Sequence, residues 1–172
     1  DWCVVGVTGS VGKTTTKDML AAALSTRYRV YATAGNFNNL IGVPITILEA
    51  PTDAEVLVVE MGMNHPGEIE RLAACAGPRV AVITNVGTSH IGLLGSREGI
   101  ARAKGEIVAP LVHAPSSTVA PDPMLVMFAE NDYTPFIAET FAKPADVPVT
   151  LVGAGEGSSL TATGVALDDE AH

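Results

Sequence analysis

The residues best suited to chemistry near the start of the chain are a glycine-rich run with one lysine, Thr8-Gly-Ser-Val-Gly-Lys-Thr-Thr15. It lies between an apolar strand-like stretch and a helix-like stretch, which is the context of a phosphate-binding loop. In such a loop, backbone N–H groups turn toward an anion, a lysine pairs with the terminal phosphates and a hydroxyl reaches Mg2+. A chance strand-to-helix turn is the alternative, since Val7 stands where the pattern has its first glycine. We predict these nucleotide-binding residues: Gly9, Ser10, Val11, Gly12, Lys13, Thr14 and Thr15.

Two further polar residues stand just past predicted strands. Glu60 ends the apolar run Val56-Leu-Val-Val59, where a carboxylate can hold the metal ion of a nucleotide site. An exposed acid at a strand end is the alternative. His90 ends the loop Thr84-Asn-Val-Gly-Thr-Ser-His90. A loop histidine by itself is more often solvated than a ligand, but the expected neighbourhood makes His90 a metal-ligand candidate.

Lys104 has an unusual setting for a lysine. On a helix, its neighbours three and four residues away are all apolar: Ile100, Ala101, Ile107 and Val108. Burial lowers the pKa of an ammonium group, and a neutral amine can react with CO2 to give a carbamate. The alternative is a buried stem whose ammonium group reaches water.

A loop rich in asparagine follows the second predicted strand. Asn36, Asn38 and Asn39 lie in the segment Gly35-Asn-Phe-Asn-Asn-Leu-Ile-Gly-Val-Pro44 and offer several amide donors and acceptors. Asparagine and glycine are also common in ordinary turns. We predict substrate binding because this loop should lie in the same crevice as the phosphate loop.

Runs rich in Val and Ile alternate with helical stretches, a pattern typical of an α/β fold with a mostly parallel sheet flanked by helices. Strands are expected at 2–7, 29–33, 55–59, 79–83, 124–129 and 147–152, with an edge strand at 165–167. Helices are expected at 14–25, from Pro44, between Pro66 and Gly77, at 96–112 and at 133–142, with a loop or linker at 113–123. Ligands bind beyond the carboxyl ends of such strands, so loops 8–13, 34–42, 60–65 and 84–95 should share one crevice.

The composition limits the classes of protein that fit. The chain has 172 residues, 47% of them hydrophobic, which suits one domain with a real core. A net charge of -9 with only 10 Lys and Arg argues against binding to nucleic acid or an anionic membrane. Without a membrane-spanning run or signal peptide, we expect a soluble, cytoplasmic monomer. Cys3 and Cys75 lack ligand-like spacing, and we expect reduced core thiols.

Together, these motifs resemble the Mur ligase family over residues 4–108. The segments that carry the resemblance are TGSVGKTT at 8–15, GNFNNLIGVP at 35–44, EMGMNHPGEI at 60–69, TNVGTSHIGLLGS at 84–96 and AKGEI at 103–107. The second and third segments look specific to the D-alanyl-D-alanine-adding branch. The resemblance implies that residues 1–172 are a P-loop NTPase-like central domain of that family. Since the chain starts without Met inside a strand, we expect it to be an incomplete fragment of a longer protein.

The resemblance also implies a reaction and a role for each residue. ATP would phosphorylate the terminal carboxylate of UDP-N-acetylmuramoyl-tripeptide, and D-alanyl-D-alanine would attack the acyl phosphate, in peptidoglycan precursor synthesis. By that analogy, Lys13 steadies the phosphoryl group, and Thr14 and Glu60 hold one Mg2+. His90 and a carbamate on Lys104 would serve a second Mg2+, and the asparagine loop would face the muramoyl substrate. One residue and one segment depart from the family pattern: Gly92, and Phe128-Ala-Glu-Asn-Asp132.

Three alternatives stay open at this point. The parent protein could be another ligase of the superfamily, such as a diaminopimelate- or lysine-adding enzyme or a folylpolyglutamate synthase, although the GNFNN segment argues against these. It could be a P-loop nucleotide-binding module without ligase chemistry, although the chain lacks the guanine-reading Asn-Lys-x-Asp segment expected of a switch. Finally, the chain could fold but be inactive on its own.

Overall fold

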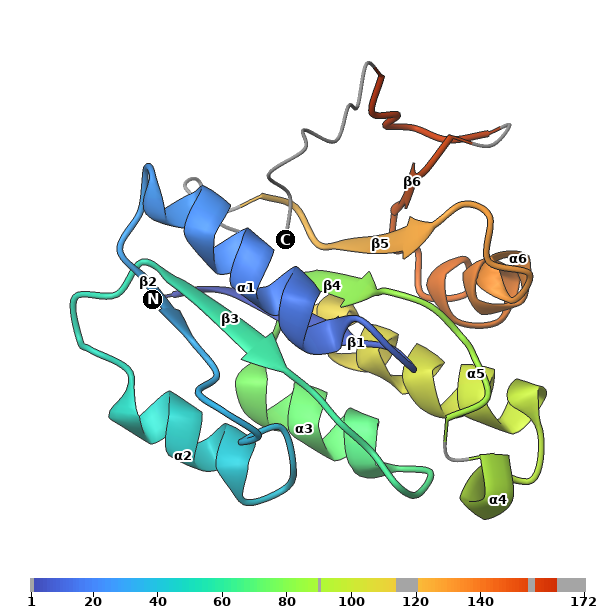
Figure 1. Ribbon diagram of the computed structural model, residues 1–172, viewed down its shortest axis with the longest axis horizontal. Coiled ribbons are helices and arrows are strands. Elements are labelled where there is room, and N and C mark those ends of the chain that lie inside the picture. The colour runs from blue at the N-terminus through green and yellow to red at the C-terminus, as the bar shows by residue number, and fades with distance from the viewer. Residues whose placement is uncertain (1, 90, 114–120, 155–156, 164–172) are drawn as a thin grey trace, which may run out of the picture.

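The computed structural model describes residues 2–89, 91–113, 121–154 and 157–163. Within these residues a wholly parallel sheet has the strand order β2-β3-β1-β4-β5-β6 (Figure 1). The strands are β1 (Cys3–Thr8), β2 (Val30–Ala32), β3 (Val56–Glu60), β4 (Val80–Ile83), β5 (Met124–Phe128) and β6 (Val149–Val152). The predicted parallel sheet is therefore confirmed, and β1 lies between β3 and β4.

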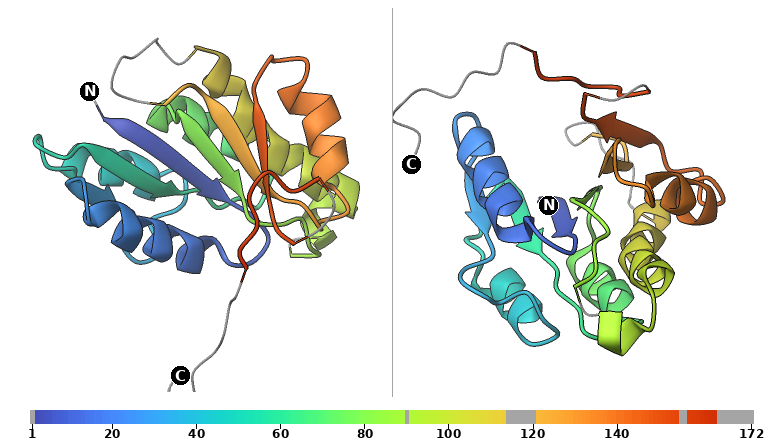
Figure 2. Two further views of the ribbon diagram at one scale, coloured as in Figure 1. Left: turned by 90° about the horizontal axis from the view of Figure 1, so that it is seen from above. Right: turned by 45° about the vertical axis from the view of Figure 1, so that its right-hand side comes forward.

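Helices lie on both faces of this sheet. They are α1 (Lys13–Ser25), α2 (Gly42–Glu49), α3 (Glu68–Ala76), the short α4 (Ile91–Leu94), α5 (Arg97–Gly105) and α6 (Thr134–Ile137). A 3-10 segment η1 (Glu106–His113) continues α5, and a π-helical turn η2 (Ala138–Ala142) continues α6. In Figure 2, α1 covers one face of the sheet and α3 and α5 lie on the other. The fold thus has three layers, with the sheet in the middle.

The core follows the alternation of side chains along the strands. Val5, Val7 and Val58 pack on the α1 side of the sheet, together with apolar residues of that helix. Their neighbours Val4 and Val59 belong to the larger cluster, which includes side chains of α3, α5 and η1. Strands buried on both faces are typical of parallel sheets, which explains why their sequences are almost wholly apolar.

Several predicted helix ends were wrong, each for a local reason. The Asn39 side chain accepts hydrogen bonds from the backbone N–H groups of Ile41 and Gly42, at 3.0 and 2.9 Å, so α2 starts at Gly42. Pro44 then lies in the first turn, where its missing N–H costs nothing. Helix α3 starts only at Glu68, because Gly67 has the left-handed conformation (φ 82°).

The predicted helix at 96–112 is also divided. Its start is confirmed, since the Ser96 hydroxyl accepts a hydrogen bond of 3.0 Å from the backbone N–H of Gly99. The α-helix ends at Gly105, and the following 3-10 segment contains Pro110, which has no N–H to donate. At 133–142, a single turn of α-helix is followed by the π-helical turn.

The cysteine prediction was partly wrong. Both thiols are free, but Cys75 is exposed and Cys3 is half-buried, so Cys75 is not a core residue. Most of the expected loop at 113–123 and all of the expected strand at 165–167 lie outside the described residues. None of the described helices is both long enough and apolar enough to cross a membrane.

Candidate active site

The predicted phosphate loop occupies the turn between β1 and α1. Gly12 precedes the first residue of α1 and has the left-handed conformation (φ 79°), which glycine adopts without strain. The Lys13 ammonium donates a hydrogen bond of 3.0 Å to the carbonyl oxygen of Gly9. The first N–H groups of a helix have no acceptor within the helix, so those at the start of α1 are available to an anion. These features suit the predicted binding of phosphate.

Glu60 is a buried carboxylate held on three sides. Its side chain accepts hydrogen bonds of 2.8 Å from the Thr14 hydroxyl and 2.8 Å from the Asn38 amide. The backbone N–H of Glu60 donates a hydrogen bond of 3.0 Å to the Thr33 hydroxyl oxygen. With 2% of its surface exposed, Glu60 is not the solvent-exposed strand-end acid of the alternative interpretation.

Lys104 is buried as the helical pattern predicts. Only 2% of its surface is exposed, and its neighbours Ile100, Ala101 and Ile107 are buried with it. Desolvation, together with the smaller effect of the positive charge of Lys13, lowers the pKa of Lys104 to about 7. The alternative of an ammonium group that reaches bulk water is therefore wrong.

This pKa predicts how the stability of the fold depends on pH. Below about pH 7, Lys104 is protonated in both the folded and the unfolded chain, and burial of the ammonium group then costs stability. The step from the ordinary pKa of 10.5 to about 7 corresponds to roughly 5 kcal/mol. In CO2-free buffer, Lys104→Met should therefore stabilise the fold most at pH 6, and the gain should shrink as the pH rises from 7 toward 10.5. Urea unfolding of both proteins at several pH values measures the difference in the free energy of unfolding.

Lys17 provides a control for that experiment. It is also buried, but its ammonium group donates a hydrogen bond of 2.9 Å to the carbonyl oxygen of Thr33 and pairs with Asp18 at 2.8 Å. Lys17→Met is expected to lose stability because it removes these interactions. A gain for Lys104→Met that is the same at every pH would contradict the lowered pKa.

A cavity of about 370 Å3 brings five of the predicted site residues together. Its lining residues are Gly9, Lys13, Asn38, Asn39, Leu40, Ile41, Gly62, Met63, Asn64, Glu68 and Lys104. Residues of three of the four loops that were expected to share a crevice line this cavity, namely loops 8–13, 34–42 and 60–65. Asn36 is exposed and is not among the lining residues, and His90 lies outside the described residues.

The fourth loop, 84–95, contacts the phosphate loop instead of lining the cavity with its described residues. The Asn85 side-chain oxygen accepts hydrogen bonds from the N–H groups of Ser10 and Val11, each at 3.1 Å. The Thr84 hydroxyl donates to the carbonyl oxygen of Val11 at 2.6 Å. Asn85 was missed as a site residue, although its place directly after the strand beside β1 was a usable signal.

The oxygen ligands at this site suit a Mg2+ ion that also binds phosphate better than a metal ion held by protein side chains alone. Among the described residues, no three His, Cys, Asp or Glu side chains form a group that could hold a metal ion. Mg2+ usually keeps several waters and binds one or two carboxylates together with substrate phosphates. The hydroxyl of Thr14 and the carboxylate of Glu60, 2.8 Å apart at the phosphate loop, are oxygen donors of that kind.

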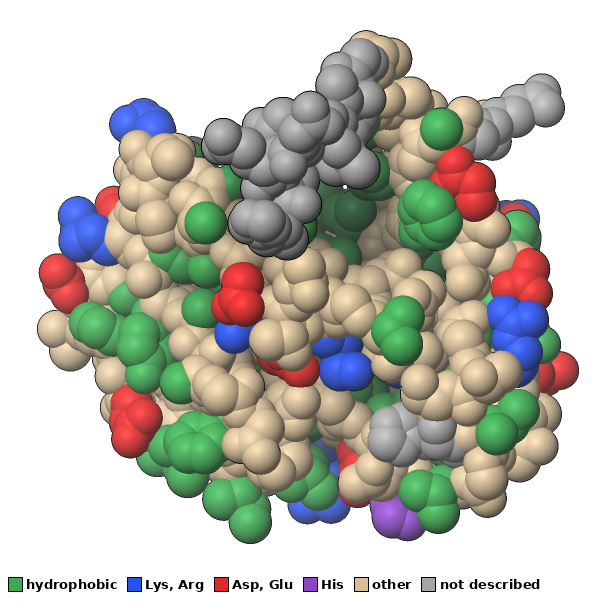
Figure 3. Space-filling model, in the orientation of Figure 1, with side chains coloured by type: hydrophobic (Ala, Val, Ile, Leu, Met, Phe, Trp, Pro, Cys, Tyr) green, Lys and Arg blue, Asp and Glu red, His purple; other side chains and the backbone are tan. Residues whose placement is uncertain are grey.

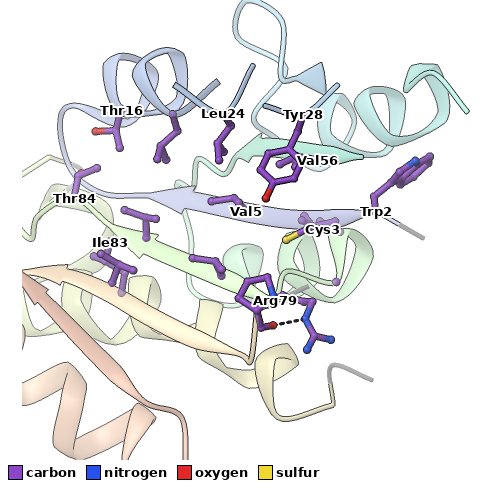
Figure 4. A pocket seen from close by; sticks show the side chains of 18 of the residues that line it. Trp2, Cys3, Val5, Thr16, Leu24, Tyr28, Val56, Arg79, Ile83 and Thr84 are labelled. Carbon is purple, nitrogen blue, oxygen red and sulfur yellow. Dashed lines mark hydrogen bonds between the residues drawn. The ribbon is translucent and has the colours of Figure 1, made fainter. Parts of the chain in front are cut away.

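A second, mainly apolar cavity of about 1580 Å3 lies on the α1 face of the sheet. Figure 3 shows a hollow with hydrophobic side chains on the face seen in Figure 1. In Figure 4, Tyr28 and Leu24 lie across from Val5, and Ile83 and Thr84 line the cavity farther along. Of the predicted site residues that the structure describes, none lines this cavity.

Comparison with known proteins decides the family. A family model described as the Mur ligase middle domain matches residues 7–171. The chain belongs to the Mur ligase family. A curated relative of this Mur ligase domain, the UDP-N-acetylmuramoyl-tripeptide--D-alanyl-D-alanine ligase of Bacillus subtilis, is 61% identical over 105 residues, which are 61% of the chain and 23% of the relative.

Solved structures of Mur ligases share the fold. A crystal structure of MurF from Acinetobacter baumannii superposes with a TM-score of 0.82 and 38% identity, over 96% of this chain and 34% of that one. MurF from Thermotoga maritima, solved in complex with ADP, gives a TM-score of 0.73 and 36% identity, over 89% of this chain and 33% of that one. The Mur ligase domain described here thus spans about a quarter of the curated relative and a third of the solved chains.

Proposed function

We propose that this chain is the nucleotide-binding part of a longer ATP-dependent amide ligase that joins D-alanyl-D-alanine to UDP-N-acetylmuramoyl-tripeptide. The observation that carries the proposal is the convergence of Lys13 and Lys104 on one cavity beside the buried carboxylate of Glu60. Membership of the family and the names of the relatives support the substrates. On this proposal, the parts that bind the UDP group and the amine lie elsewhere in the ligase.

The residues of the phosphate loop suit transfer of a phosphoryl group from ATP to a carboxylate. Such transfer depends mainly on positioning and on neutralising charge. The Lys13 ammonium and the N–H groups at the start of α1 provide positive charge at one edge of the cavity. The acyl phosphate formed would then be attacked by the amine of D-alanyl-D-alanine, which forms the amide bond and releases phosphate. The ADP complex of the Thermotoga maritima relative supports nucleotide binding at this fold.

Mg2+ would be held by Thr14 and Glu60. When bound, it supplies charge neutralisation for the phosphates. The hydrogen bond between Thr14 and Glu60 already places both oxygens at the loop, so little rearrangement of the protein is needed. The Asn38 amide holds the other oxygen of the same carboxylate and thereby fixes its orientation.

Lys104 is proposed to carry a carbamate. Its neutral amine would attack the carbon of CO2 and release one proton to water, which leaves a carbamate anion on the buried side chain. Burial among apolar side chains favours the neutral amine from which this reaction starts. An anion at this position would help to hold a second Mg2+, for which His90 is the other proposed ligand.

The asparagine loop is proposed to face the muramoyl substrate. Asn38 and Asn39 both line the cavity, but their side chains also have structural roles, at Glu60 and at the start of α2. Asn36 is exposed and is the member of the loop with the weakest support. We also propose that the ligase is a cytoplasmic monomer that binds neither nucleic acid nor membrane.

An amine panel with the full-length ligase tests this function. With ATP and UDP-N-acetylmuramoyl-tripeptide, we expect phosphate release and an amide product with D-alanyl-D-alanine, but not with lysine, diaminopimelate or glutamate. The isolated chain should bind ATP-Mg weakly and form no product. ATP hydrolysis that no amine stimulates would favour a nucleotide-binding module, and a preference for another amine would favour a different ligase of the superfamily. Product from the isolated chain would show that the missing parts are dispensable.

A further inference from the structure

The loop after β4 runs beside the phosphate loop. Strands β1 and β4 are parallel neighbours, with Thr8 opposite Ile83, so the residues that follow each strand leave the sheet side by side. The backbone N–H of Ser10 is shared between the side-chain and main-chain oxygens of Asn85, both at 3.1 Å. The N–H of Val11 donates to the same side-chain oxygen, also at 3.1 Å. One asparagine therefore engages two successive N–H groups of the phosphate loop.

Two further hydrogen bonds join the same segments. The Thr84 hydroxyl donates to the carbonyl oxygen of Val11 at 2.6 Å, and the N–H of Gly87 donates to the Ser10 hydroxyl at 2.9 Å. Thr84 can approach this closely because Gly9 has no Cβ, which would collide with the Thr84 hydroxyl. Each of the two loops thus both donates hydrogen bonds to the other and accepts them from it. Together these hydrogen bonds fix the backbone of residues 9–11.

The other side of the β4 loop is also anchored. The carbonyl oxygen of Val86 accepts hydrogen bonds from the Arg97 guanidinium at 2.9 Å and from the Asn131 amide at 3.3 Å. Arg97 in turn forms an ion pair of 2.6 Å with Asp132. The support for Asn85 therefore comes from α5 and from the segment after β5, both distant in sequence from the phosphate loop.

These contacts divide the phosphate loop into two halves. The N–H groups of Ser10 and Val11 already have an acceptor, so a phosphate could use them only by displacing Asn85. The N–H groups at the start of α1 have no acceptor within the helix. We propose that Asn85 is a positioning residue that holds the first half of the phosphate loop and confines phosphate binding to the N–H groups from Gly12 onward. This inference rests on the proposed function, and it narrows the predicted range of phosphate-binding residues.

The test compares two substitutions at Asn85 in the full-length ligase. Asn85→Ala removes the side-chain acceptor but keeps the main-chain oxygen that also accepts from Ser10. The N–H of Val11 should therefore exchange with solvent faster in the nucleotide-free ligase, and that of Ser10 should change less. Its affinity for ATP should fall about tenfold, with a matching rise in the KM for ATP and little change in the KM for the amine. Asn85→Asp keeps an oxygen acceptor, so exchange should stay slow. Its added charge should also weaken ATP binding, but this loss relative to the wild type should shrink as salt is raised.

Asn131→Ala is the matched control, because it removes a donor to the far side of the same loop. Because Arg97 still donates its shorter hydrogen bond to Val86, this change should leave the exchange of Ser10 and Val11 slow. Unchanged exchange and unchanged ATP affinity in Asn85→Ala would overturn the inference, and so would fast exchange in Asn85→Asp. If the wild-type ligase bound no ATP, the proposed function would fail, and the inference that rests on it would fall with it.

Discussion

Lys104→Ala is expected to lower the turnover of the full-length ligase by about 100- to 1000-fold, the usual cost of losing one group that stabilises charge at a reacting centre. The side chain is buried at the cavity that Lys13 also lines, so its loss removes the proposed anion from the site. The fold should survive, because replacing a buried amine also removes an unfavourable desolvation. Steady-state turnover and urea unfolding of the same preparation measure the two effects.

Rescue by small anions makes this prediction specific. Lys104→Ala leaves space where a formate or acetate ion can stand in for the carbamate, so millimolar short carboxylic acids should restore part of the turnover. Lys104→Met is the matched control, because its side chain fills that space and should prevent rescue. Mass spectrometry of the intact wild-type ligase with nucleotide and Mg2+, prepared to preserve the labile adduct, should show the mass of one added CO2. Wild-type turnover in Lys104→Ala, in both CO2-free and CO2-rich buffer, would refute the role.

Lys13→Met is expected to weaken ATP binding by at least about 100-fold, which corresponds to roughly 2.7 kcal/mol. The ammonium group lies at the phosphate loop, where a point charge is needed for the terminal phosphates. Stability should change little, because Lys13 is only half-buried and its ammonium group donates a hydrogen bond to the carbonyl oxygen of Gly9 near the surface. Isothermal titration calorimetry of the full-length ligase measures the affinity.

A second lysine provides the control for the loss of positive charge. Lys143 is exposed and pairs with Glu139 at 2.6 Å, away from the cavity lining. Lys143→Met should leave ATP binding unchanged. Because the charge of Lys13 lowers the pKa of Lys104, Lys13→Met should also raise the pKa of Lys104. Equal ATP affinity in Lys13→Met and the wild type would mean that residues 8–15 are not the phosphate site.

The sequence by itself determined the features that depend on neighbours along the chain. The strand-to-helix turn at residues 9–12 follows from a glycine-rich run, and the burial of Lys104 follows from apolar residues one helical turn away on either side. The parallel sheet follows from apolar runs that alternate with helical ones. In each case the signal is a local period or spacing, which a single sequence contains in full.

Only the tertiary structure decided which polar groups meet. Glu60 is 46 residues from Thr14 and 22 from Asn38, and Asn85 is 75 residues from Ser10. Strand order brings these pairs together, because β1 lies between β3 and β4 and the loops after these strands emerge at one edge of the sheet. No periodic pattern records that order. Hydrogen bonds between loops that follow neighbouring strands therefore distinguish the two asparagines. Asn85 accepts hydrogen bonds from the predicted phosphate loop, whereas Asn36 is exposed and does not line the cavity.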